Sequence, residues 1–80
     1  MPRFKTLTFS QLEKILRSFS FQTVSQRGSH IKMVRNHFGV GQVLIFPRHR
    51  ELRKGTLKGI FNQAKRYVSE TELRKPFYTY

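Results

Sequence analysis

The sequence predicts an α+β fold: a helix, three antiparallel strands, a second helix and a short C-terminal helix. Two stretches, near residues 8–19 and 56–68, repeat apolar residues at the three- and four-residue spacing of amphipathic helices. Between them lie three short runs of strand-forming composition, separated only by brief turns. Such short connections join antiparallel neighbours. We expect both main helices on one face of the sheet and water on the other.

The first helix is predicted from its cap and its apolar stripe. Thr8 is the expected N-cap, and Gln11 stands three residues later, as a capping box requires. The apolar stripe consists of Leu12, Ile15, Leu16 and Phe19. Ser20 and Phe21 are expected to end the helix.

The first two strands are predicted on either side of a glycine–serine break. Strand-favouring residues run from Gln22 to Ser25 and continue to the break at Gly28 and Ser29. The next strand is expected from His30 to Arg35. Because side chains alternate across a strand, Ile31 and Met33 should face one way and His30, Lys32 and Val34 the other.

The third strand follows a turn predicted over residues 36–41, whose composition, NHFGVG, is typical of a hairpin loop. The run QVLIF forms this strand, and Pro47 closes it. Beyond it lies the basic loop RHRELRKG, which leads to the second helix.

The second helix is predicted to begin at a Thr56 cap and to bury a stripe of Leu57, Ile60, Phe61, Ala64 and Val68. Ser69 with Glu72 forms another possible capping box, which would start a last short helix that Pro76 stops.

Length and composition predict one domain, residues 1–80. No apolar stretch approaches the ~20 residues that a membrane span requires, and the first residues have no apolar signal core. We therefore expect a cytoplasmic protein without a membrane partner. The chain has no Cys, which excludes disulfides and cysteine metal sites.

Charge is the strongest bulk signal in the sequence. Sixteen Lys and Arg stand against four acidic residues, giving a formal net charge of +12. Such an excess indicates a polyanion or an acidic protein as partner. The basic residues follow no single amphipathic helix, so a nucleic acid is favoured over a membrane surface.

The acidic residues are too few and too scattered for metal-dependent hydrolysis. Two-metal nucleases hold their ions with clustered carboxylates. This chain has no Asp, and its four Glu, at positions 13, 51, 70 and 72, share no strand with His30. The spacing of His30, His37 and His49 matches no zinc motif. We expect no metal and no cofactor.

Histidine and cations suffice to cut RNA, because the substrate's own 2′-hydroxyl is the nucleophile. The protein then has to move protons and stabilise charge on the phosphorus. Histidine performs the first task near neutral pH, and Lys or Arg the second. From these residues alone, His30 is either such a proton carrier or a solvated strand residue.

Three motifs carry a resemblance to a known family: GSHIKM after the first helix, PRH closing the third strand, and GTLKGIFNQA opening the second helix. Together they resemble the HicA (YcfA-like) toxins, over about residues 8–73. These are small bacterial proteins that cleave mRNA, have a fold similar to the double-stranded-RNA-binding domain, and are neutralised by a HicB antitoxin. The resemblance implies that His30 is catalytic, without a metal, and that mRNA and an acidic HicB-like antitoxin are the partners.

The chain departs from this family in three places. Family members commonly end the first helix with Gly-Phe, where this chain has Ser20 before Phe21. A glycine usually ends the second helix soon after the Gln-Ala pair, whereas KRYV continues the helical pattern here. The tail RKPFYTY has no counterpart in the family.

The expected RNA-binding residues, besides the catalytic His30, surround the same motifs: Arg27, Gly28, Ser29, Lys32, Arg48, His49, Arg50 and Lys54. Gly28 and Ser29 also fit a purely turn-forming role, and Lys32 and His49 fit simple solvation. Phe38, Tyr67, Phe77, Tyr78 and Tyr80 could stack on bases, although packing is their usual role. The alternative to an enzyme is a non-catalytic RNA-binding module with the same basic surface.

Overall fold

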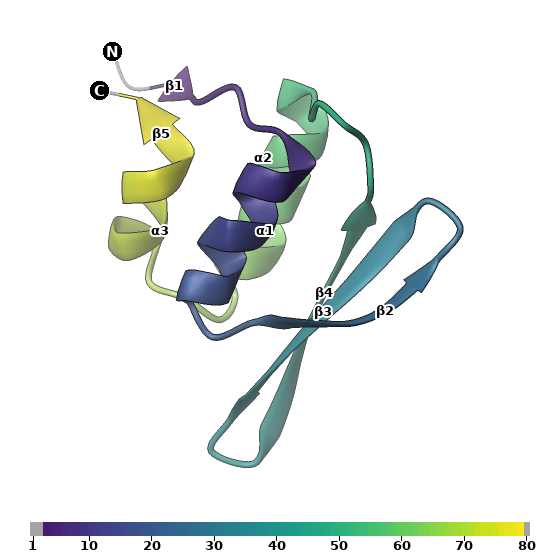
Figure 1. Ribbon diagram of the computed structural model, residues 1–80. Coiled ribbons are helices and arrows are strands. Elements are labelled where there is room, and N and C mark those ends of the chain that lie inside the picture. Colours follow the sequence, from purple (N-terminus) through teal and green to yellow (C-terminus); the bar gives the residue numbers. More distant parts are fainter. Residues whose placement is uncertain (1–2, 80) are drawn as a thin grey trace.

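The computed structural model describes residues 3–79 and has the predicted α+β order, with two short terminal strands added (Figure 1). The elements are β1 (Arg3–Phe4), α1 (Phe9–Ser18), β2 (Gln22–Arg27), β3 (His30–His37), β4 (Val40–Pro47), α2 (Lys54–Ala64), α3 (Glu70–Phe77) and β5 (Tyr78–Thr79). None of the described helices is long and apolar enough to cross a membrane.

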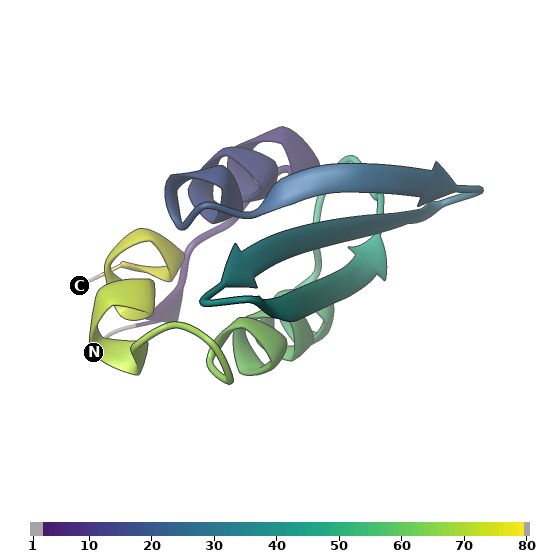
Figure 2. The same cartoon turned by 90° about the horizontal axis from the view of Figure 1, so that it is seen from below.

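The central sheet has the antiparallel order β2-β3-β4. Figure 1 places α1 and α2 on the same side of this sheet, and Figure 2 shows α1 nearer β2 and α2 nearer β4. Ile31 and Met33 of β3 are buried, whereas His30 and Lys32 are exposed. The predicted alternation along β3 is therefore confirmed, and we call the face that bears His30 the open face.

The core lies between the helices and the inner face of the central sheet, which is the face opposite to the open face. Its buried side chains come from the three helices, from β3 and β4, and from the segments that join the elements: Leu7, Phe9, Leu12, Leu16, Phe21, Ile31, Met33, Leu44, Phe46, Leu52, Leu57, Ile60, Phe61, Ala64, Val68, Leu73 and Phe77. This list includes all the apolar residues predicted for α2, and two of the four predicted for α1. Ile15 and Phe19 of α1 are partly buried against the same cluster.

The cap of α1 is confirmed, whereas the predicted Thr56 cap of α2 is wrong. The Thr8 hydroxyl accepts from the Gln11 amide, and the Gln11 side chain accepts from the Thr8 amide. Helix α2 starts at Lys54, before Thr56, because the Arg53 carbonyl already accepts from the Leu57 amide at 2.9 Å.

The other boundary corrections concern α2, α3 and the β3–β4 turn. Helix α2 ends at Ala64, and a tight turn over residues 65–67 then brings Val68 into the core. Ser69 is the N-cap of α3 without a side-chain cap bond. Pro76 lies within α3, which continues one residue past it to Phe77; its missing amide leaves the last turn one backbone bond short. The β3–β4 turn has two residues, so both strands extend into the predicted loop.

Ser20 stands where the resemblance leads us to expect a glycine, and its backbone has a conformation that glycine adopts readily. The Ser20 amide bonds to the Arg17 carbonyl, and the Phe21 amide bonds to the Leu16 carbonyl. This pair of bonds is the Schellman motif, which needs a left-handed residue after the helix. Ser20 has φ 74°, a conformation that costs a non-glycine residue about 1–2 kcal/mol.

The terminal residues pack on α2 through aromatic rings. Strand β1 pairs with β5, so that Phe4 stacks on Tyr78 at 4.5 Å between ring centroids. Both rings meet Phe61 edge-on, and Phe77 is fully buried beside them. The packing role expected for Phe77 and Tyr78 is confirmed, and Tyr67 also packs on the core. Tyr80 lies outside the described residues.

Arg35 ties four segments together from the inner face of β3. Its guanidinium donates to the Phe19 carbonyl at the end of α1, and to the Tyr67 carbonyl after α2. Its Nε donates to the Gln42 amide oxygen on β4, and its guanidinium carbon lies 5.0 Å above the Phe21 ring. A planar guanidinium reaches all these acceptors at once, which an ammonium group does not.

We expect Arg35→Met to lower the free energy of unfolding by about 2–4 kcal/mol, because two carbonyls and an amide lose a charged donor in partly buried positions. Arg35→Lys should recover only part of this loss. Urea denaturation measures both variants. Arg66→Met is the matched control, since Arg66 is exposed, and it should shift stability by less than about 0.5 kcal/mol. Equal losses at positions 35 and 66 would contradict this role of Arg35.

Candidate functional site

The Gly-Ser-His and Pro-Arg-His motifs lie side by side at one end of the sheet. His30, the first residue of β3, pairs with Pro47, the last residue of β4. The Arg48 amide then donates to the Ser29 carbonyl. Strand pairing thus joins two motifs that are distant in sequence.

Gly28 is explained by the backbone of the β2–β3 turn. It has φ 59°, and Arg27 and His30 pair directly on either side of the two-residue turn. A positive φ at the first turn position is typical of a II′ hairpin, which favours glycine there. No atom lies within 4 Å of the place where a Cβ would stand, so the turn is also open above Gly28.

His30 is exposed on the open face with two of the predicted cations. A shallow pocket on this face is lined by Ser25, Gln26, Arg27, His30, Ile31, Lys32 and Ile45. Arg27 is the cross-strand partner of His30, and Lys32 follows two residues along β3 on the same face. The structure therefore brings His30, Arg27 and Lys32 together.

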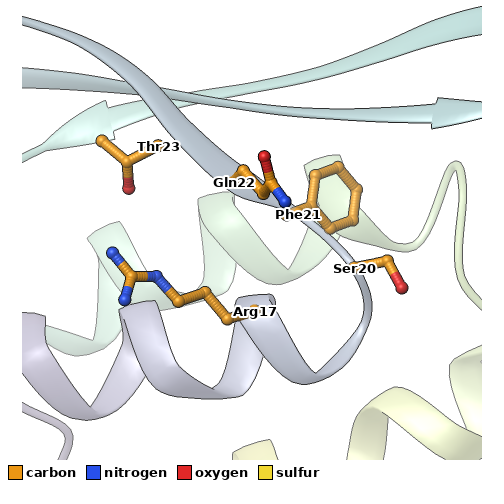
Figure 3. A pocket seen from close by; sticks show the side chains of 5 residues that line it. All are labelled: Arg17, Ser20, Phe21, Gln22 and Thr23. Carbon is orange, nitrogen blue, oxygen red and sulfur yellow. The ribbon is translucent and has the colours of Figure 1, made fainter.

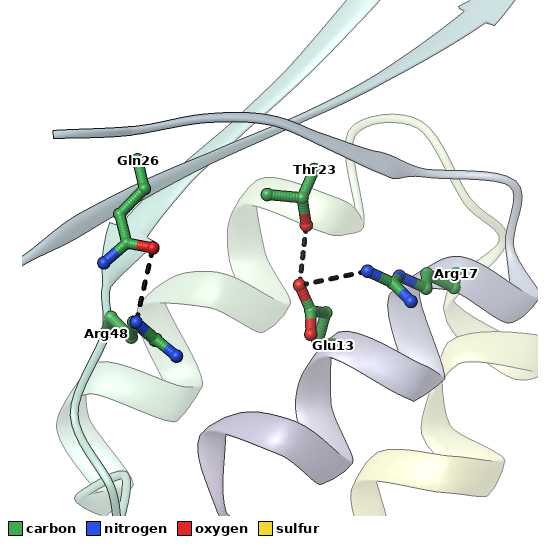
Figure 4. Close-up of polar contacts among 5 residues, drawn as sticks. All are labelled: Glu13, Arg17, Thr23, Gln26 and Arg48. Carbon is green, nitrogen blue, oxygen red and sulfur yellow. Dashed lines mark hydrogen bonds and ion pairs between the residues drawn. The ribbon is translucent and has the colours of Figure 1, made fainter.

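Arg48 extends to the other side of the sheet. Its guanidinium donates to the Gln26 amide oxygen at 3.3 Å (Figure 4). The guanidinium carbon also lies 5.3 Å from the centre of the Phe9 ring. A second pocket is lined by Thr8, Phe9, Ser10, Arg48, His49 and Arg50. The predicted RNA-binding residues are thus divided between the open face and the start of α1.

Both groups nevertheless share one end of the molecule, where α1 and α2 begin (Figure 1). The Phe9 amide bonds to the Arg50 carbonyl, and α2 starts at Lys54. Helix N-termini present unpaired amides and a partial positive charge, which favour anions. We call this the cationic end and define it by Arg27, Arg48, Arg50, Arg53 and Lys54.

Most carboxylates lie away from this end. Glu13 accepts from the Thr23 hydroxyl at 2.7 Å and pairs with Arg17 at 3.4 Å (Figure 4), while Glu70 pairs with Lys65 and Arg74. Glu51 is near the cationic end and is exposed. Over residues 3–79, no group of three or more His, Cys, Asp or Glu side chains is placed to hold a metal ion.

A separate hollow lies where α1 ends and β2 begins, lined by Arg17, Ser20, Phe21, Gln22 and Thr23 (Figure 3). It contains neither a histidine nor a carboxylate, and it surrounds the end of α1 opposite to the cationic end. We therefore place the candidate site at His30.

The family model described as "HicA toxin of bacterial toxin-antitoxin" matches residues 9–65. This chain belongs to the HicA toxin family. The match spans both motifs at the cationic end and stops directly after α2, so α3 and the tail lie outside it. Toxins of this family are RNases, and membership implies a cognate antitoxin. No curated protein and no solved structure matches the chain.

Gln63 is a supporting residue that the sequence analysis missed, although it lies in the GTLKGIFNQA motif. Its side-chain amide donates to the Ile45 carbonyl and accepts from the Ile45 amide, at 2.9 and 3.1 Å. It thereby satisfies backbone groups on the outer edge of β4, the strand whose last residue, Pro47, pairs with His30. The sequence did contain a signal for this role, because Gln63 is a polar residue among the core-facing positions of α2.

Proposed function

We propose that this HicA toxin is a metal-independent endoribonuclease that cleaves mRNA, with His30 as its proton-transfer residue. The observation that carries the proposal is the position of His30. Its imidazole is exposed at the cationic end, and Arg27 is its neighbour on the adjacent strand β2. Proton transfer requires an accessible group, and the phosphate requires nearby positive charge.

The proposed reaction needs only groups of the RNA and of this chain. The 2′-oxygen attacks the adjacent phosphorus, the bond from phosphorus to the 5′-oxygen breaks, and a 2′,3′-cyclic phosphate and a 5′-hydroxyl result. One proton leaves the 2′-hydroxyl and one is delivered to the 5′-oxygen. His30 carries out one or both transfers. Arg27 and Lys32 stabilise the charge on the phosphorane.

The remaining predicted residues hold the flanking phosphates in this proposal. The open space above Gly28 admits a phosphate oxygen close to the turn backbone, where Ser29 also lies. Arg48, His49, Arg50 and Lys54 contact phosphates on the side where α1 and α2 begin. Such contacts supply affinity rather than sequence selection.

The metal-free route is supported by the donor set. The chain has no Cys, its four acidic residues are all Glu, and two of these pair with basic side chains of the helical layer. A two-metal mechanism requires carboxylates gathered at the scissile phosphate.

We expect His30→Ala to reduce RNA cleavage by roughly 10²-fold or more, the usual effect of losing a general acid or base. RNA affinity should persist because Arg and Lys contacts supply most of it. Since His30 is exposed, thermal stability should change by less than about 0.5 kcal/mol. Gel assays, binding titrations and thermal melts measure the three quantities.

Val43→Ala is the control for His30→Ala, because Val43 lies on the same open face, farther along the sheet. It should cleave RNA at the normal rate. A His30→Ala protein that stays folded and cuts RNA fully would move catalysis to another residue, with His49 tested next. If the unmodified protein binds RNA and cuts none, the non-catalytic RNA-binding alternative replaces this proposal.

We expect cleavage to continue in excess EDTA and to yield 2′,3′-cyclic or 3′ phosphate ends. An otherwise identical substrate with 2′-deoxyribose at the cleaved position should remain intact, because it lacks the nucleophile. Mass spectrometry of the products identifies the ends. Activity that disappears on chelation and returns with Mg²⁺ would contradict the mechanism.

We also propose that the antitoxin of this toxin is an acidic, HicB-like protein that covers the open face at His30. The net charge of +12 and the gathering of Arg27, Arg48, Arg50, Arg53 and Lys54 support an acidic partner. An inhibitor on this surface would exclude the RNA phosphates directly.

For this pair we expect fast association that slows markedly as salt rises, because opposite charges steer the encounter and salt screens them. Stopped-flow mixing of toxin and cognate antitoxin over a range of NaCl concentrations measures the rate. A rate that does not depend on salt would refute electrostatic steering. If the double variant His30→Ala/Arg27→Ala binds the antitoxin as tightly as the unmodified toxin does, the interface lies elsewhere.

A further inference from the structure

The β3–β4 turn carries the most exposed Phe or Tyr ring among the described residues. Phe38 is 92% exposed, and Val40, two residues later, is 62% exposed. Every other Phe or Tyr between residues 3 and 79 is buried or packs against the core. The hairpin extends beyond the helices at the end of the sheet opposite to His30 (Figure 1). We call residues 37–40 the hairpin tip.

The backbone at this tip disfavours phenylalanine. Phe38 has φ 51° and Gly39 has φ 81°, the two positive values that a type I′ turn requires. Asn and Gly are preferred in such turns, and a bulky side chain at positive φ is unusual. The side chain of Phe38 gains no burial in return. Folding alone therefore gives no reason for a ring at this position.

The ring is nevertheless held by a neighbour. The His37 imidazole meets it nearly perpendicularly, at 75° and 4.5 Å between centroids. The Asn36 side chain accepts from the Gly39 amide at 3.0 Å, which closes the turn beneath it. An aromatic ring that is supported but not covered is the kind of platform on which nucleic-acid bases stack.

We propose that Phe38 stacks on an RNA base at a second contact, remote from the cleaved phosphate. This proposal rests on the proposed RNA substrate and adds a binding residue to it. Seven strand steps separate His37 from His30, a span of roughly 23 Å at the usual rise. About seven stacked nucleotides cover that length. RNA held at both points would lie along the hairpin, so that long substrates bind better than short ones.

A base fits the tip better than a pocket on a protein partner does. Stable protein interfaces bury roughly 800 Å² on each side, whereas this tip offers one ring and one valine on a projecting turn. Stacking needs only the ring face, and the chain's charge of +12 brings RNA to it. Protein binding through Phe38 is the competing outcome of the test.

The test compares Phe38→Asn with its parent in a His30→Ala background, so that the RNA stays intact. Asn suits the turn, so the thermal midpoint should stay equal or rise. Affinity for an RNA of about 20 nucleotides should fall roughly fivefold to 100-fold, the range for losing one base–aromatic stack. Affinity for an RNA of about four nucleotides, too short to reach both points, should not change. Fluorescence anisotropy measures both.

Two controls separate the ring from its surroundings. Phe38→Trp should retain the affinity for long RNA, and Val40→Thr should leave it unchanged because a valine offers no stacking face. Unchanged affinity for long RNA in Phe38→Asn overturns the proposal, as does a loss confined to antitoxin binding. The binding assay does not depend on catalysis. A failure of His30 as the catalytic residue would therefore appear in cleavage assays and leave this result readable.

Discussion

The alternation of side chains along β3 is the constraint on which both the core and the site depend. Ile31 and Met33 are buried between the sheet and the helices, so His30 and Lys32 must face the opposite side. A one-residue slip of β3 would turn His30 toward the core and expose the apolar residues. The free energy of core burial thus fixes the histidine on the open face, although His30 itself contributes little packing.

Two polar side chains hold this register from the helical side. Arg35 has the same inward direction as Ile31 and Met33, but it lies where the helices end, and three acceptors satisfy its guanidinium. Gln63 of α2 pairs with the backbone of Ile45 and fixes the outer edge of β4. Strand β4 ends at Pro47, which pairs with His30. The contacts of Arg35 and Gln63 with β4 therefore help to fix the position of the next residue, Arg48, although they lie far from the site.

The sequence predicted the element order and the faces of β3, because apolar periodicity records which side is buried. It did not predict the start of α2: Thr56 is a favourable cap residue, but the backbone bond from Leu57 to Arg53 begins the helix earlier. Nor did it predict that Arg48 and His30 lie on different sides of the sheet. Arg48 follows the strand, where alternation no longer applies, and its contact with Phe9 is set by tertiary packing.

The distribution of charge connects the fold with its ligands. At the cationic end, Arg48, Arg50, Arg53 and Lys54 lie near the starts of α1 and α2, and Arg27 lies at the end of β2 beside His30, while the paired Glu13 and Glu70 lie on the helical side. Like charges at this density repel one another and oppose compact folding. A bound polyanion removes that repulsion and stabilises the folded state by an amount that rises with the logarithm of its affinity. The RNA and the acidic inhibitor that we propose offer the same compensation, so both would compete for one surface.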